Sequence, residues 1–465
     1  MTLRPFVLAL GAALIGDLSA DNGARAQQTP PDESILGTVE VNGSAGGWGQ
    51  VPLQKLAVVP LVTTGPADSM AQLITKRDID LSGQFDVIAD GLAPPGPWTL
   101  TTPIDWTPWL ENKVEVIVRV YSQPSAKAGF VTLVGDIYLP PPKDERKPKD
   151  AGASVEAGAP PLPPPPPAKP VFTTKIEAGT GELRAASHRL VDALLGGLTG
   201  RPGSFASHMA FAGRVGKWRQ IFVVDADGFN LHPLGPANGS ALSPVFGPGG
   251  EVFYTLSADF HRYKMVHGDK ADLLPFNVSG SVLGMGFSPD RKSLAFASFE
   301  NSTGTIYVTS PIGAPLRAVS TEPNANHPTI GPTGKIAYVA GRDAQRVFIE
   351  GKAISPGGFL ASAPSWCDTE KGLLIVLTVG FGAWADVIAI DVNGGGIRRL
   401  TQGMGANTSA TCSPDGRLVA FFSDRGMPGK GPGLYMVPIA RPWLAKKIGG
   451  DVGEGLRWDA LERPK

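Results

Sequence analysis

The chain has 465 residues, of which 42 are Lys or Arg and 42 are Asp or Glu. A balanced charge without a long run of one sign lacks the field that attracts a nucleic-acid backbone, so we expect no nucleic-acid partner. The length suffices for two or three domains, because a single core rarely grows beyond roughly 250 to 300 residues. The 59 Gly and 44 Pro favour short strands joined by tight turns.

The first 26 residues have the pattern of an export signal. Arg4 precedes an apolar run over residues 6–15, and Ala24-Arg25-Ala26 provides an Ala-x-Ala cleavage pattern. The apolar run is about half of the roughly 20 residues that a membrane span needs. We therefore expect cleavage after Ala26 and a soluble, monomeric protein of the periplasm that does not insert into a membrane.

A polar arm and an α/β domain follow the signal. Residues 27–54 are rich in Gly and lack periodicity, which predicts a loosely attached arm. Over residues 55–198, apolar runs alternate with helical patterns, which predicts a mixed sheet with two helices. The expected strands are 55–61, 85–89, 114–121, 130–139 and 171–177.

The two expected helices have apolar stripes at helical spacing. The first begins near Asp68 and is expected to bury Met70, Leu73 and Ile74. The second, over 182–198, has a stripe of five apolar residues. They are Leu183, Ala186, Leu190, Leu194 and Leu198.

A proline-rich insertion occupies residues 140–170, between two strands that are expected to pair. It contains 12 prolines and the charge cluster 143–147, so it can form neither a strand nor a packed helix. It is either a polyproline II ligand at 163–167 or a disordered hairpin tip, which costs little loop entropy. We favour the disordered tip.

From residue 208 onward the sequence repeats. A Ser-Pro-Asp-Gly-like turn recurs between apolar strands, as at Pro248, Pro289 and Pro332, which are 41 and 43 residues apart. This period matches the four-stranded blades of a propeller with WD40-like repeats. Residues 208–234 supply only three strands, and residues 456–459 near the C-terminus match the missing first strand. We expect six blades over 208–461 and a tail at 462–465.

Several motifs resemble those of the TolB family. They include Ala57-Val58-Val59-Pro60, the segment 79–85, the helix 183–192 and the linker Thr199-Gly200-Arg201-Pro202-Gly203-Ser204-Phe205. In that family the helix and linker join the α/β domain to the propeller, so the linker is placed at 199–207. The proline-rich insertion and Cys412, where an aromatic residue is typical, depart from the family pattern.

The resemblance implies a non-enzymatic periplasmic scaffold of the Tol-Pal system. Such a protein binds the lipoprotein Pal through its propeller and TolA through its mature N-terminal arm, and supports outer-membrane integrity and invagination during cell division in the cell cycle. The expected arm residues are Gln27, Asp32, Glu33, Ile35 and Leu36.

Catalytic, metal-binding and cofactor motifs are absent from the sequence. It contains no Gly-x-Ser-x-Gly, His-Glu-x-x-His or Walker pattern, so we expect no enzyme and no cofactor. His188 and Asp192, four residues apart, lack a third metal ligand nearby, which favours a hydrogen bond at the domain junction. The expected junction residues are His188, Asp192, Thr199, Gly200, Gly203 and Phe205.

The partner surface is expected on one face of the propeller. The linker enters at the start of a second strand, so we place the N-terminal domain by the loops between first and second strands, which leaves the opposite face open. Its loops combine polar groups with aromatic and Arg anchors, as interface hot spots do. The expected residues are Asn238, Asp259, Phe260, His261, Asn326, His327, Phe381, Trp384, Asn407, Asp424 and Arg425.

Two alternatives concern the cysteines and the function. Cys367 and Cys412 occupy the first strands of neighbouring blades one position apart in register, so we expect two buried thiols, although the periplasm would permit a bond. The competing function is a secreted propeller that binds a small ligand or a glycan.

Overall fold

The computed structural model describes residues 32–36, 52–62, 65–142, 168–276, 278–342, 344–394, 396–403, 405–424 and 431–458. The chain divides into two compact units, Gly47–Ala206 and the combination of Met1–Gly46 with Ser207–Lys465. The expected export signal, Gln27, Arg425 and residues 143–167 of the insertion lie outside the described residues. Among the described residues, no helix combines the length and the apolar character needed to cross a membrane.

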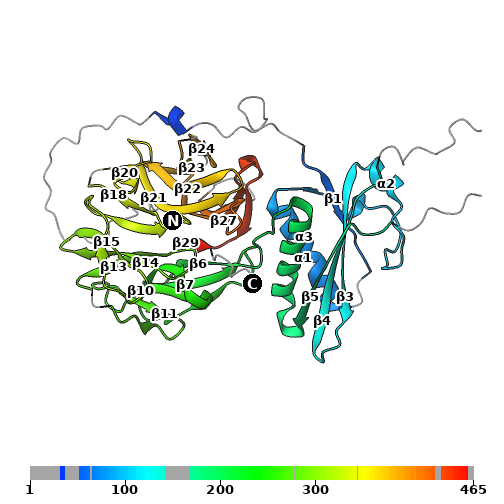
Figure 1. Cartoon of the computed structure of the whole chain (residues 1–465), viewed down its shortest axis with the longest axis horizontal. Coiled ribbons are helices and arrows are strands. Elements are labelled where there is room, and N and C mark those ends of the chain that lie inside the picture. Colours follow the sequence, from blue (N-terminus) through cyan, green and yellow to red (C-terminus); the bar gives the residue numbers. More distant parts are fainter. Residues whose placement is uncertain are drawn as a thin grey trace, which may run out of the picture. The chain divides into compact units, whose positions relative to one another are not determined.

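The α/β unit is a five-stranded mixed sheet with two long helices side by side on one of its faces (Figure 1). The strand order is β2-β1-β3-β4-β5; β1 pairs in parallel with β2 and β3, whereas β4 and β5 are antiparallel. In chain order the elements are β1 (Lys55–Val58), α1 (Pro66–Ser82), β2 (Asp86–Val87), η2 (Asp90–Leu92), α2 (Trp106–Glu111), β3 (Val114–Pro124), β4 (Phe130–Tyr138), β5 (Phe172–Gly179), η4 (Thr180–Glu182) and α3 (Leu183–Thr199).

The buried face of α1 differs from the expected one. Ile74 is 2% exposed, but Met70 and Leu73 are 36% and 71% exposed. The helix instead buries the side that carries Asp78, whose Oδ2 lies 2.6 Å from Nδ1 of His188 on α3. A helix can bury only one stripe, and here this polar contact between the helices decides which one.

Helix α3 packs tightly on the sheet, as its apolar stripe predicts. Leu194 lies against Gly135 of β4, where an added Cβ would come within 3.0 Å of the leucine side chain. Strand β4 pairs with β5, and Ile137 lies opposite Phe172. The two strands therefore form the hairpin that the proline-rich insertion interrupts.

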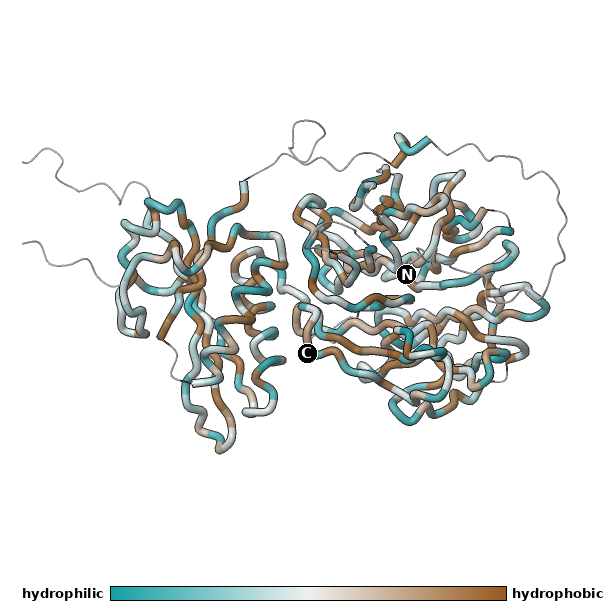
Figure 2. Tube along the Cα trace, turned by 180° about the vertical axis from the view of Figure 1, so that it is seen from behind, coloured by the Kyte–Doolittle hydropathy of each residue, from teal (hydrophilic) through white to brown (hydrophobic). Residues whose placement is uncertain are grey.

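The second unit is a six-bladed propeller, so the expected fold class of an α/β domain plus a propeller is confirmed. Hydrophobic segments, brown in Figure 2, run along the strands of both units. The blades are numbered in chain order, and each is given from its innermost to its outermost strand. Blade 1 has β29 (Glu454–Trp458), β6 (His208–Val215), β7 (Trp218–Asp225) and β8 (His232–Leu234), blade 2 has β9 (Ser240–Phe246), β10 (Val252–Ser257), β11 (Lys264–His267) and β12 (Asp272–Leu273), and blade 3 has β13 (Ser281–Phe287), β14 (Leu294–Glu300), β15 (Thr303–Thr309) and β16 (Arg317–Ala318). Blade 4 has β17 (Asn326–Ile330), β18 (Ile336–Ala340), β19 (Arg346–Ile349) and β20 (Lys352–Ala353), blade 5 has β21 (Leu360–Thr369), β22 (Gly372–Phe381), β23 (Trp384–Asp391) and β24 (Ile397–Arg399), and blade 6 has β25 (Asn407–Cys412), β26 (Leu418–Ser423), β27 (Gly433–Pro438) and β28 (Lys446–Gly449).

The ring closes through the last strand. Strand β29 pairs antiparallel with β6 (Figure 1), and in this register Trp458 lies opposite Met209. The indole nitrogen of Trp458 donates a 2.7 Å hydrogen bond to Ser207 Oγ. The first blade thus combines strands from both ends of the propeller sequence, as expected, and β29 is the innermost strand of its sheet.

The expectation of two free thiols is wrong. Cys367 on β21 and Cys412 on β25 form a disulfide with their Cα atoms 5.5 Å apart. The alternation of side chains along a strand predicts which residues share a face of one sheet. Strands β21 and β25, however, belong to different sheets that pack face to face. Their registers are independent, and both sulfur atoms point into the apolar layer between blades 5 and 6.

Removal of this disulfide is expected to destabilise the propeller. The bond closes a loop with a sequence separation of 45, so the double variant Cys367→Ser and Cys412→Ser should lose about 2 to 4 kcal/mol of unfolding free energy. Urea unfolding of the mature protein measures this difference. Thiol counting in denaturant without reductant should find no free thiol, and a count of two would contradict the bond.

Candidate partner-binding surface

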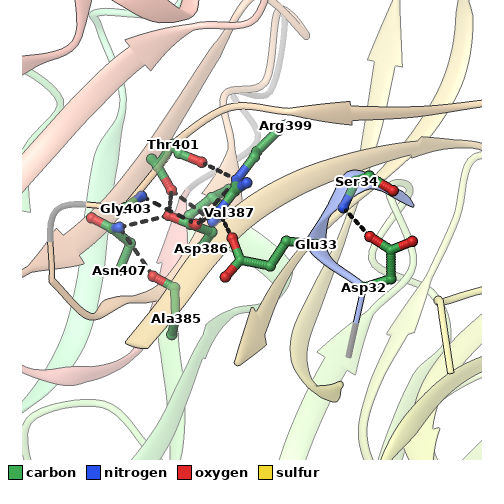
Figure 3. A network of polar contacts seen from close by, with 10 residues as sticks. All are labelled: Asp32, Glu33, Ser34, Ala385, Asp386, Val387, Arg399, Thr401, Gly403 and Asn407. Carbon is green, nitrogen blue, oxygen red and sulfur yellow. Dashed lines mark hydrogen bonds and ion pairs between the residues drawn. The ribbon is translucent and has the colours of Figure 1, made fainter. Parts of the chain in front are cut away.

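A network of buried polar groups lies at the edge of blade 5 (Figure 3). Asp386 is fully buried and accepts hydrogen bonds from Arg399 Nη2 at 2.5 Å and Nε at 3.1 Å. Thr401 Oγ1 donates to the same carboxylate at 2.7 Å, and Asn407 Nδ2 donates at 3.2 Å. Both buried charges are therefore paired, and the remaining carboxylate lone pairs have donors, which keeps the cost of burial low.

The N-terminal arm contacts this network. Its described part is a single turn, η1 (Glu33–Leu36), in which Ser34 N–H donates to Asp32 Oδ1 at 2.9 Å. Arg399 Nη2 donates to Glu33 Oε2 at 3.1 Å, as Figure 3 shows. One arginine therefore joins a buried aspartate of the blade to a half-exposed glutamate of the arm.

The turn is also held by an apolar contact. Leu36 is fully buried in the core cluster that lies between blades 4 and 5, where Phe381 and Trp384 are partly buried. Phe359 packs edge-on against Trp384 with ring centroids 5.8 Å apart. The sequence assigned Leu36 to one partner and the two aromatic residues to another, and the structure brings all three to the same cluster. Ile35, in contrast, is 46% exposed.

The predicted open face consists of the loops between second and third strands and those that lead into each first strand. The loop after β10 is ordered by Asp259, whose Oδ1 accepts from His261 N–H at 3.0 Å and Ser257 Oγ at 3.1 Å. These bonds hold the pKa of Asp259 below its usual value. Asn238 and Asp424 are also exposed at this face.

An aromatic pair projects from this face. Phe260 is 39% exposed and stacks on Trp218 of blade 1, with ring centroids 4.6 Å apart and planes at 10°. Lys217 Nζ lies 4.6 Å from the centroid of the same indole ring. The sequence prediction missed Trp218, although it is the first residue of β7, directly after the Gly216-Lys217 turn between a second and a third strand.

Not every predicted residue lies on an exposed loop. Asn407 is 1% exposed, and its side chain belongs to the buried network around Asp386. Asn326 and His327 lie within the innermost strand β17, and His327 Nδ1 contacts Asn326 Oδ1 at 2.5 Å. His327 has a φ of 47°, in the left-handed region.

This left-handed residue is one of six that recur around the propeller axis. The register of each innermost strand shifts at a β-bulge that contains a residue with positive φ. Bulges of this kind bend a strand and redirect its side chains. Gly284 N–H donates to Ser243 Oγ and Gly455 N–H to Ser409 Oγ, which links neighbouring bulges. The six residues are Ser243, Gly284, His327, Ala363, Ser409 and Gly455.

The predicted junction residues order the end of α3 and the linker. Asp192 Oδ1 accepts from Phe205 N–H at 2.7 Å, and Oδ2 accepts from Ala206 N–H at 2.9 Å. Gly200 ends α3 with a φ of 79°, and Thr199 Oγ1 donates to the carbonyl of Leu195.

The approach of the linker to α3 explains the glycine at position 203. An added Cβ at Gly203 would lie 2.6 Å from Asp192 Oδ1. The helix and linker therefore act as one element within the α/β unit, and Nδ1 of His188 on the same helix lies 2.6 Å from Asp78 Oδ2 of α1.

Fold and surface together define a class: an α/β unit linked to a closed six-bladed propeller whose exposed loops present aromatic residues. No protein-family model matches the chain. The Tol-Pal system protein TolB of Methylococcus capsulatus is 24% identical over 233 residues, 49% of this chain and 47% of that protein. TolB of Anaeromyxobacter dehalogenans is 25% identical over 265 residues, 56% and 54% of the two chains.

The chain spans about half the length of the curated relatives that it matches. The crystal structure of TolB from Acinetobacter baumannii has the same fold, with a TM-score of 0.67 and 17% identity, covering 88% of this chain and 96% of that one. The resemblance to TolB predicted from the sequence is confirmed: the chain is TolB-like in both sequence and fold.

Neutralising Asp386 is expected to be costly. Asp386→Asn keeps the shape of the side chain but leaves the guanidinium of Arg399 without its buried counter-charge, which should reduce the unfolding free energy by about 3 to 5 kcal/mol. Glu33→Gln is the matched control, because the Glu33 side chain is 52% exposed and should contribute at most about 1 kcal/mol. Equal losses in urea unfolding would contradict a structural role for the buried pair.

Proposed function

We propose that the protein is a non-enzymatic periplasmic scaffold of the Tol-Pal system that binds a Pal-type lipoprotein and a TolA-type inner-membrane protein. The observation that carries the proposal is the similarity to Tol-Pal TolB proteins in sequence, together with the full two-unit fold of a TolB crystal structure. In this role it would support outer-membrane integrity and invagination at division after export and cleavage behind Ala26.

The open face supports the assignment of the Pal-type partner. Its loops are already ordered by internal hydrogen bonds, as at Asp259, so little conformational entropy is lost on binding. The stacked pair of Phe260 and Trp218 supplies aromatic anchors of the kind that dominate interface energies. Several such loops together can provide the roughly 800 Å² per partner of a standard interface.

The arm supports the assignment of the TolA-type partner. Asp32, just before η1, and Glu33 and Ile35 on η1 are exposed, whereas Leu36 is buried in the propeller. A short segment held by one buried side chain and by an ion pair whose glutamate is half exposed can be released at modest cost, because ion pairs open to solvent contribute little. The arm is therefore suited to pass from the propeller to a protein partner.

A second candidate function is the binding of a glycan or small ligand. The exposed ring of Phe260, stacked on Trp218 and flanked by Lys217, is an aromatic platform of the kind that can also stack against an apolar face of a small molecule. The two functions differ in whether a stable protein complex forms.

Truncation of Phe260 tests whether the open face of the propeller binds the Pal-type lipoprotein. Phe260→Ala should weaken binding of the Pal-type lipoprotein by about 2 kcal/mol, roughly 30-fold, in calorimetry. Phe229→Ala is the control: Phe229 is 51% exposed but lies between β7 and β8, on the opposite face. Deletion of residues 143–168 should leave affinity unchanged. If that deletion abolishes binding while Phe260→Ala binds normally, the partner site is on the insertion.

Removal of the arm tests the other partner. A mature chain without residues 27–36 should lose measurable binding to the TolA-type protein while keeping most of its affinity for the Pal-type lipoprotein, because the Phe260 and Trp218 pair lies on blades 1 and 2, whereas the arm contacts blades 4 and 5. A chain with the same ten residues in scrambled order controls for length and composition. Retained TolA-type binding by the deleted chain would place that site on another segment.

A further inference from the structure

The innermost strand of blade 1, β29, carries an arginine that the proposed function does not use. Arg457 is on β29, two residues after the left-handed Gly455 of its bulge. The corresponding residues of the other five innermost strands are all uncharged. They are Val245, Gly286, Thr329, Ser365 and Thr411.

Arg457 is enclosed by protein and lacks a counter-charge. Its Nη1 donates a 3.1 Å hydrogen bond to the carbonyl of Leu456, and no carboxylate forms an ion pair with it within the described ranges. Burial lowers the pKa of Arg457 to about 10. The buried Arg399, in contrast, is paired with Asp386 at 2.5 Å. An enclosed guanidinium without an anion is energetically unfavourable, so this site is incomplete as it stands.

His327 lies across the axis from Arg457. Its strand β17 begins blade 4, and β29 begins blade 1, so the two strands are opposite in a ring of six. Burial, and after it the charge of Arg457, lowers the pKa of His327 to about 4. Asn326 Oδ1 accepts from Nδ1, and Nε2 has no hydrogen-bond partner in the described part of the chain.

Both side chains retain some solvent-accessible surface although protein surrounds them. This combination is expected where side chains line the central channel of a propeller. The bulges make it possible, because a regular strand would direct its side chains only toward the neighbouring blades.

We propose that the propeller axis binds one small tetrahedral oxyanion, such as inorganic phosphate or sulfate, between Arg457 and His327. The guanidinium supplies a planar set of donors that matches two oxygens of such an anion. Nε2 of His327 supplies a further donor when the ring takes up a proton, which the anion favours. The bound anion neutralises Arg457 and links the closing strand β29 to the opposite blade.

The test measures thermal unfolding and calorimetric binding of the mature chain in sodium phosphate and in sodium chloride at equal ionic strength. A ligand that binds only the folded state raises the melting temperature with concentration. Phosphate should therefore stabilise the wild-type chain more than chloride does. Arg457→Gln should bind phosphate at least about tenfold more weakly, and His327→Asn should weaken binding less. Arg317→Gln, on the exposed strand β16, is the charge-matched control and should respond like the wild type.

The melting temperature of Arg457→Gln in sodium chloride distinguishes an anion-binding role of Arg457 from a purely structural role. Since Arg457→Gln removes an uncompensated charge, it should melt at the same temperature as the wild type or higher in chloride, and lose only the response to phosphate. A lower melting temperature in chloride with an intact phosphate response would mean that Arg457 is structural. Absence of any phosphate or sulfate response in the wild type would overturn the proposal, as would binding of malonate alone.

Discussion

Closure of the propeller ring by β29 is the constraint on which the rest of the molecule depends. The strand pairs with β6 although their residues are separated by almost the whole propeller sequence. Closure completes the first blade, so that each blade is left with only a short inner and a short outer edge. It also places Arg457 at the axis, opposite His327, and fixes the sixth of the bulges that surround the channel. A chain that ended before β29 would lack all three features.

The disulfide strengthens the ring near its closure. Cys367 and Cys412 join the innermost strands of blades 5 and 6, which are held otherwise by apolar packing and by the bond from Cys412 N–H to Ser365 Oγ. Blade 5 also carries the polar network of Asp386 and Arg399 and the docked turn of the arm. The blade that receives the arm is therefore cross-linked to blade 6 and also held by a buried ion pair. The arm itself is held there by the buried Leu36 and by the ion pair of Glu33.

In the α/β unit, too, apolar packing is combined with a few specific polar contacts. Its helices pack through an apolar stripe on α3, but the contact between Asp78 and His188 sets the rotation of α1. Asp192, one turn further along α3, holds the backbone of the linker at Phe205 and Ala206. Short polar contacts thus determine the local geometry where apolar burial alone would allow more than one arrangement.

The sequence by itself determined the architecture. The repeat of about 40 residues, the split first blade and the helix and linker motifs predicted a propeller after an α/β domain, because turn chemistry and strand alternation are local properties. Local patterns could not predict the disulfide, because the registers of two packed sheets are independent. Nor could they predict that Leu36 would be buried beside Trp384 or that Asn407 would be internal. The bulge at His327 and its meeting with Arg457 depend on strands that are neighbours only after the ring has closed, so tertiary structure alone decided them.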